Sequence, residues 1–434
     1  MSAPTPTTTT TPAAKAPPRE RFTGLEGLRA VGIIAVFLTH SAFITGTTFG
    51  SKWNVHLGPV SGRPASLLGH LEIGPAIFFM ISAFLLYRPF LMASFHGTAP
   101  PSTRRFLRRR FIRVFPAYWA TLILMFALGW IHTETKLQLF RVITLTQIYT
   151  HKGFFGIDVL VPTWTLATEV TFYVFIVVWA PCMRRVTVRC DPRARLQREL
   201  VGAFALAVFA FLFRVAVYHG VARLPDVAEH WLPGTLDLFA VGMAFAAVDV
   251  YARTRGGPPR LSPLVADLCV VAAVFWFFAV PLFTNASEGI AYSTGWDAYG
   301  RDLFQLMCSA FLLAPVTFVG SSGGLYRRLM ATKPLAYIGL VSYGIYLWHD
   351  AWIVRAVHWS GGFVALKAPF WTVGVSAFSL SVVMGALSWH FLERPVLELE
   401  AGRRPFSGGP ATARPLSNNT AAPASPPPTV SVAP

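Results

Sequence analysis

The chain has 434 residues, of which 54% are hydrophobic and only 13% are charged. Soluble proteins carry about 25% charged residues, so this chain cannot cover its apolar surface in water and must use lipid as its solvent. The net charge of +17 would suit a nucleic-acid partner. No nucleic-acid-binding motif accompanies that charge, so we expect none.

The two ends of the sequence differ from its middle. Residues 1–22 are rich in Ala, Pro and Thr without an apolar run, which predicts a disordered tail rather than a signal peptide. Residues 401–434, rich in Pro, Ala, Ser and Thr, predict a second disordered tail. Residues 23–400 then form one transmembrane domain.

About ten apolar segments are long enough to cross a bilayer at roughly 20 residues each. They begin near Leu25, Ile73, Val114, Trp164, Leu200, Trp231, Ser262, Asp302, Leu335 and Pro369. The sequence therefore predicts an all-α polytopic integral membrane bundle.

The loops between these segments alternate in charge. Arginines and lysines gather in residues 104–113, 184–198, 253–260 and 327–333, and the loops between them carry fewer. By the positive-inside rule the basic loops are cytoplasmic. Both termini then lie in the cytoplasm, which requires an even number of spans, and we expect a multi-pass protein of the plasma membrane.

The first segment carries two ionisable residues on one face. Arg29 and His40 are eleven residues apart, which returns to nearly the same helix face with His40 roughly 16 Å deeper. Arg29 also suits an interfacial anchor, and His40 an interhelical hydrogen bond. An ionisable residue inside the membrane is nevertheless a candidate for function.

A dense arginine cluster leads into the third segment. Arg105, Arg109 and Arg113 share a helix face at four-residue steps. Arginine forks bind phosphate groups in a planar, bidentate manner, so the cluster predicts a phosphate-bearing ligand. Anionic lipid headgroups are the alternative.

Two further segments contain polar groups in apolar surroundings. Glu169, in the outer half of the fourth segment, needs a partner, and His40 is a candidate. Otherwise Glu169 holds helices together. In the ninth segment His349 and Asp350 follow Tyr343 and Tyr346, which suits either an outer aromatic belt or a substrate site.

Other catalytic and cofactor-binding motifs are absent from the sequence. It has no phosphate-binding loop, nucleophile elbow or metal-ligand spacing, and its four cysteines suggest packing rather than disulfides. We expect no metal and no tightly bound cofactor. In the HFLERP run near the end, Pro395 is expected to end the last helix, and Glu393 has no predicted catalytic role.

These motifs together resemble the membrane acyltransferase-3 family of bacterial O-antigen and other cell-envelope O-acyltransferases. The resemblance covers nearly the whole chain between the tails. Its elements are the Arg29 to His40 spacing, the arginines before the third segment, W-[ST]-L-x-x-E-x-x-[FY]-Y at 164–173, S-Y-x-x-Y-L-x-H at 342–349 and a weaker D-x-x-x-x-G at 237–242. One element departs, because Ala83 replaces the glycine of the family's FF-x-x-SGFL motif.

The resemblance implies transfer of an acetyl or other short acyl group from acyl-coenzyme A to a hydroxyl of an envelope glycan, glycolipid or similar acceptor. The catalytic residues it implies are His40, as base or acyl carrier, and Glu169. The donor would be a cytoplasmic co-substrate held by Arg29, Arg109, Arg110 and Arg113. The carbohydrate or lipid acceptor would contact Trp164, Tyr346 and His349.

The main alternative is a proton-coupled transporter of a lipid or glycan substrate. It would use His40 and Glu169 as a proton relay. A relay does not need dense cytoplasmic arginines, so the sequence favours the acyltransferase. Membrane lipids are expected partners in either case.

Overall fold

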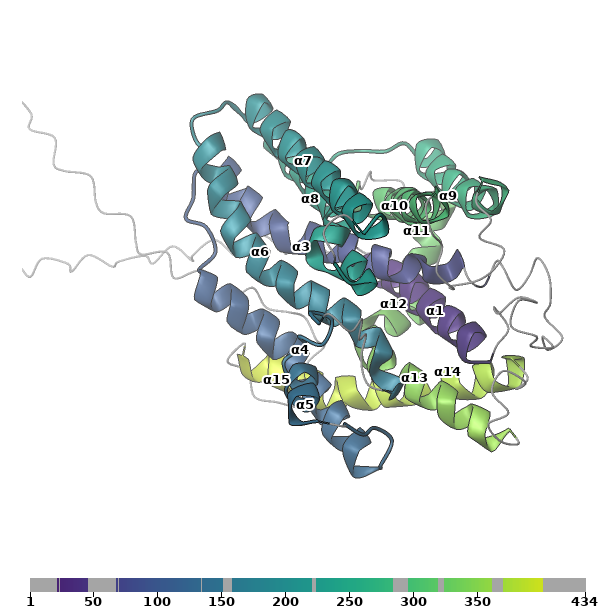
Figure 1. Ribbon diagram of the computed structural model, residues 1–434. Coiled ribbons are helices and arrows are strands. Elements are labelled where there is room, and N and C mark those ends of the chain that lie inside the picture. The colour runs from purple at the N-terminus through teal and green to yellow at the C-terminus, as the bar shows by residue number, and fades with distance from the viewer. Residues whose placement is uncertain are drawn as a thin grey trace, which may run out of the picture.

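The computed structural model describes residues 22, 24–45, 68, 70–133, 135–150, 158–220, 224–283, 296–318, 324–360 and 370–400, and these residues contain helices but no strand (Figure 1). The two predicted tails lie outside this part of the chain, apart from Phe22. The helices are α1 (Leu25–Ile44), α3 (Ile73–Phe95), α4 (Thr103–Ala127), α5 (Lys136–Ile143), α6 (Trp164–Thr187), α7 (Pro192–Tyr218), α8 (Leu232–Thr254), α9 (Pro263–Phe283), α10 (Trp296–Thr317), α11 (Leu325–Met330), α12 (Lys333–Leu340), α13 (Ser342–Trp359), α14 (Phe370–Ser388) and α15 (Arg394–Glu400).

Seven helical stretches among the described residues are long and apolar enough to span a membrane. Helices α9, α10 and α13 occupy the other three predicted positions. The all-α membrane bundle is therefore confirmed, whereas the count of ten is not.

The outer faces of the bundle are apolar, as lipid requires. Large hydrophobic side chains on four different helices are between 66% and 71% exposed: Ile123 (α4), Phe204 (α7), Leu264 (α9) and Val375 (α14). In water such a surface would aggregate. In a bilayer it faces acyl chains.

Two helices begin earlier than the hydropathy pattern predicted. Helix α4 begins at Thr103 rather than near Val114, and α7 begins at Pro192 rather than near Leu200. Arginine is a good helix former, so both basic stretches continue the helix beyond the apolar part. Asp191 caps α7 by accepting hydrogen bonds from the backbone N–H groups of Ala194 and Arg193, which lower the pKa of its carboxyl.

The predicted ninth segment is two helices instead of one. Helix α12 ends at Leu340 and α13 begins at Ser342. Helix α12 packs so closely on α1 that a Cβ atom on Gly339 would lie 1.7 Å from the carbonyl oxygen of Glu26. The same helix α1 also packs against α13. The break therefore allows both helices to contact α1 at different depths.

The last helix does not end at Pro395 as predicted. A π-helical turn, Trp389–Glu393, joins α14 to α15, and helical structure continues to Glu400. Proline lacks an N–H group and clashes with the preceding turn of a regular α-helix. The wider π turn directly before Arg394 changes the hydrogen-bond pattern there, so Pro395 is accommodated.

Helices α3 and α8 form one of the closest contacts in the bundle. At Gly242 in α8, a Cβ atom would lie 2.3 Å from the carbonyl oxygen of Met80 and 2.7 Å from the Cβ of Ala83. The glycine of the weak D-x-x-x-x-G element therefore faces the position where the family's usual glycine is an alanine. The close approach of α3 and α8 depends on Gly242, since Ala83 already fills part of the space.

A buried ionic network joins α7, α8 and α10. Arg214 forms a two-pronged ion pair with Asp237, with donor–acceptor distances of 3.0 and 2.7 Å, and its Nε lies 2.9 Å from Asp302. The Tyr218 hydroxyl donates to Asp302 at 2.9 Å. Asp237, the acidic residue of the D-x-x-x-x-G element, thus has a structural partner.

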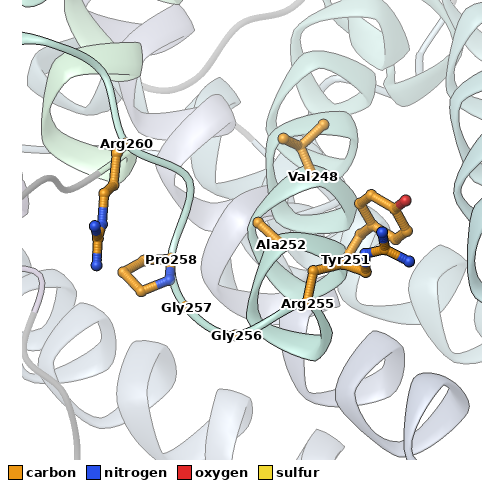
Figure 2. A pocket seen from close by; sticks show the side chains of 8 residues that line it. All are labelled: Val248, Tyr251, Ala252, Arg255, Gly256, Gly257, Pro258 and Arg260. Carbon is orange, nitrogen blue, oxygen red and sulfur yellow. The ribbon is translucent and has the colours of Figure 1, made fainter.

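A shallow cavity of about 500 Å³ lies where α8 passes into the loop at Gly256–Pro258 (Figure 2). Arg255 and Arg260 stand on opposite sides of this loop. None of the residues predicted to bind donor or acceptor lines it.

Candidate active site

Two histidines from distant parts of the chain meet inside the bundle. His40 lies about one turn before the end of α1, and His349 lies in the middle of α13. His40 Nδ1 and His349 Nε2 are 2.7 Å apart, and the two rings stack with centroids 5.0 Å apart. His349 is fully buried, and the His40 side chain is 26% exposed. We call these residues the histidine pair.

Hydrogen bonding determines which nitrogen of each neutral ring carries a proton. His349 Nδ1 lies 2.6 Å from the carbonyl oxygen of Tyr346, which can only accept, so Nδ1 donates. Nε2 of His349 is then an acceptor, and His40 donates to it from Nδ1. The lone pair of His40 is therefore on Nε2, where a base needs it.

Asp350 is the acidic neighbour of the histidine pair. Its Oδ1 lies 3.4 Å from His40 Nδ1 and 3.2 Å from His349 Nε2. Asp350 is only 7% exposed, and no donor among the described residues makes a hydrogen bond to Oδ1. A carboxylate in this position would stabilise a positive charge on His40.

Tyr346 connects the histidine pair to α6. Its hydroxyl lies 2.8 Å from Thr165 Oγ1 and also contacts the carbonyl oxygen of Pro162. Its ring centroid is 5.7 Å from that of His349. Two predicted acceptor residues, Tyr346 and His349, are thus brought together beside His40.

Trp164, the third predicted acceptor residue, contacts a different histidine. It begins α6, and its ring stands edge-on to His230 with centroids 4.3 Å apart. It also packs edge-on against Phe79 at 6.1 Å. The described ring contacts of Trp164 are therefore with Phe79 and His230 and not with the histidine pair.

Glu169 has other described partners than His40. Ser82 Oγ donates to Glu169 Oε1 at 2.6 Å, and Tyr173 lies within electrostatic reach of the same carboxylate. Arg29 and Arg110 are within electrostatic reach of Glu169. Glu169 therefore interacts electrostatically with these arginines, and the acid in contact with His40 is Asp350.

The predicted donor arginines divide into two groups. Arg109 lies 3.6 Å from Glu400, and Arg113 lies 3.2 Å from Glu393 and over the ring of Trp389. Arg29 and Arg110 have no such ion pair within 4 Å among the described residues. They are the arginines whose charge is least neutralised by a direct acidic partner.

A polar path connects the arginines with the histidine pair. Arg29, Arg110 and Arg113 interact electrostatically with one another or with Glu169. Tyr346 lies within electrostatic reach of both Glu169 and Asp350. Charged groups inside a bundle are costly without a purpose or partner, so this set of polar side chains is a candidate region for a polar ligand.

The described residues form an all-helical membrane protein with two histidines and an aspartate in contact inside its bundle. A family model described as an acyltransferase domain matches residues 22–390. The chain therefore belongs to the acyltransferase-3 family, as its motifs predicted.

Curated relatives match most of the chain at low identity. The peptidoglycan O-acetyltransferase OatA of Listeria monocytogenes is 23% identical over 87% of this chain and 56% of its own length. The putative peptidoglycan O-acetyltransferase YrhL of Bacillus subtilis is 26% identical over 86% and 54%. This chain thus spans just over half the length of these two relatives.

The putative membrane-bound transacylase BcsY of Komagataeibacter xylinus is 26% identical over 88% of this chain and 85% of its own length. No solved structure matches the chain significantly.

Proposed function

We propose that this protein transfers an acetyl or other short acyl group from acyl-coenzyme A to a hydroxyl of an envelope glycan, glycolipid or similar acceptor. The observation that carries the proposal is the hydrogen-bond chain from the Tyr346 carbonyl through His349 to His40. It leaves the lone pair on His40 Nε2, which a hydroxyl nucleophile requires of its base. The names of the relatives, O-acetyltransferases and a transacylase, support the same reaction class.

The chemistry follows from the position of that lone pair. His40 Nε2 takes the proton of the acceptor hydroxyl while its oxygen attacks the thioester carbonyl carbon. The carbon–sulfur bond then breaks, and the proton passes from His40 to the departing coenzyme A sulfur. Asp350 stabilises the imidazolium between these two steps. The products are the ester and free coenzyme A.

The direction of approach follows from the charge distribution. By the positive-inside rule, the arginine-rich loops face the cytoplasm, where acyl-coenzyme A is available. Phosphates of its head would bind Arg29 and Arg110, and the flexible arm would extend along the polar path toward His40, roughly 16 Å along α1 from Arg29. The acceptor would reach His40 from the opposite side of the membrane.

The proposal is tested with the purified full chain in lipid vesicles, labelled acetyl-coenzyme A and an extract of envelope glycans and glycolipids. We expect protein-dependent transfer of label into an alkali-labile ester. Mass spectrometry of envelopes with and without the gene should identify the same ester. Vesicle transport of an envelope substrate without any ester formation would favour the transporter instead.

The donor site gives a separate prediction. We expect Arg29→Ala and Arg110→Ala each to weaken coenzyme A binding by about 10- to 100-fold, because a hydrogen bond to a charged group contributes about 1.5–3 kcal/mol. Lysine should restore little if the contact is bidentate. Binding is measured by calorimetry on protein in nanodiscs.

Arg108→Ala is the matched control for this experiment. Arg108 lies on the same helix, but its side chain is 59% exposed and pairs with Glu400. It should bind coenzyme A like the unmodified protein. If all three variants bind coenzyme A with the same affinity, Arg29 and Arg110 do not form the donor site.

A further inference from the structure

Three potential metal ligands converge at the histidine pair. His40 Nδ1, His349 Nε2 and Asp350 Oδ1 are separated by 2.7, 3.2 and 3.4 Å, and each residue offers one ligand atom to the group. Zinc binds imidazole nitrogen and carboxylate oxygen at about 2.0–2.2 Å in tetrahedral geometry, which separates two ligand atoms by about 3.3 Å. One ion could therefore contact all three atoms with small side-chain shifts.

We propose that these three atoms form a site for Zn²⁺, and that zinc bound there inhibits the acyl transfer. The site has the usual composition of two imidazoles and one carboxylate with a fourth position open. Nitrogen-rich sites of this kind prefer zinc and similar transition metals over Mg²⁺ and Ca²⁺, which prefer oxygen ligands. The inhibitory part of the proposal rests on the function proposed above.

The surroundings of the three atoms favour a cation. His349 Nδ1 donates to the Tyr346 carbonyl, which is the second contact that orients metal-binding histidines and directs the Nε2 lone pair at the ion. Asp350 Oδ1 is buried and accepts no hydrogen bond from the described residues. Such an atom is uncommon in a folded protein, and a metal ion would satisfy it.

Inhibition follows from the protonation state that zinc would impose on His40. As the base, His40 carries its proton on Nδ1 and its lone pair on Nε2. Zinc needs the lone pair on Nδ1, so the one N–H proton of the neutral ring would be on Nε2 instead. That atom can then no longer accept the proton of the acceptor hydroxyl. The ion also removes the contact of Asp350 with the ring.

The ligands of this site are too far apart in the chain for a sequence motif to show them. His40 and His349 are 309 residues apart, so no short ligand spacing exists in the chain. The expectation of no metal came from spacing alone, and the experiment below tests it.

The test uses the full chain in nanodiscs and Zn²⁺ or Co²⁺ salts. We expect one Zn²⁺ per chain by calorimetry and a Co²⁺ absorption spectrum typical of four- or five-coordinate sites. Asp350→Asn and His349→Ala should each weaken binding by at least about 10- to 100-fold, the loss that even outer contacts of a metal site cause. Binding should be unchanged in His96→Ala, where the histidine is exposed and contacts only the Met92 carbonyl in the described hydrogen bonds.

Unchanged zinc affinity in Asp350→Asn and His349→Ala would overturn the site, as would no stoichiometric binding at all. If these variants do not fold, X-ray absorption on the zinc-loaded unmodified protein decides. Two imidazoles and a carboxylate oxygen around the ion support the site, and any other ligand set contradicts it.

The effect on catalysis is measured separately from binding. Zn²⁺ should abolish acyl transfer in the unmodified protein, and a chelator should restore it. Transfer that requires zinc would contradict the inhibitory role. If the protein transfers no acyl group while Co²⁺ gives the expected spectrum, the proposed function fails and the metal site remains.

Discussion

His40→Ala should reduce acyl transfer by about 10²–10⁴-fold, the usual loss when a positioned base is removed. Without the imidazole, the acceptor hydroxyl loses the Nε2 lone pair that would take its proton. The loss should be larger still if His40 carries the acyl group. The measurement is single-turnover transfer from labelled acyl-coenzyme A in lipid vesicles.

Two controls make the result on His40 specific. The variant should bind coenzyme A normally, because the arginines that would hold the phosphates lie elsewhere. His96→Ala, which changes an exposed histidine, should transfer at the normal rate. Turnover by His40→Ala close to that of the unmodified protein would exclude the histidine from the reaction.

Arg214→Ala should cause the largest loss of stability among single changes to the buried network. It removes the partner of Asp237, which is 4% exposed, and takes the 2.9 Å ion pair from Asp302. Breaking a buried ion pair by removing one partner costs about 3–5 kcal/mol, because the other charge stays buried. Arg214→Lys should cost less, since it keeps the charge but not the two-pronged contact.

Stability is measured as the temperature at which detergent-solubilised protein loses its monodisperse peak in size-exclusion chromatography. Arg255→Ala is the control, because Arg255 is exposed at the end of α8. If the midpoint for Arg214→Ala equals that of the control, the network contributes no net stability.

The fold class could be predicted from the sequence because lipid allows few solutions. Apolar length and alternating arginine loops were enough to place helices near Leu25, Ile73 and Trp164, where α1, α3 and α6 begin. The early start of α4 could not be read from hydropathy, since its first turns are helical but basic. The break before Ser342 could not be predicted from hydropathy either, because it depends on how α12 packs against α1.

The site was only partly predictable for a related reason. Helical periodicity shows which residues share one face of one helix, and it put Arg29 and His40 together. It does not show which helices meet face to face. Consequently Glu169 was expected beside His40, whereas the described contact is with Asp350. The only sequence signal for Asp350 was its position next to His349.

The arginines of α4 illustrate the same limit. Arg109, Arg110 and Arg113 look alike in the sequence. Glu393 had no predicted catalytic role, and its ion pair with Arg113 could not be foreseen from a position 280 residues away. The acids that distinguish Arg109 and Arg113 from Arg110 come from the last helical stretch of the described chain.

In that last stretch, the number of residues, and not only their type, decides which arginines of α4 have an acidic partner. A π-helical turn holds one residue more than an α-helical turn, and one residue rotates everything after it by about 100°. With Trp389–Glu393 in this form, Glu400 faces α4 and reaches Arg108 and Arg109. A chain shorter by one residue here would keep every acid and every arginine, yet the carboxylate of Glu400 would point to a different side of the helix. The set of α4 arginines that pair with Glu400, and so the set that stays without an acid among the described residues, therefore depends on the length of a turn far from them in sequence.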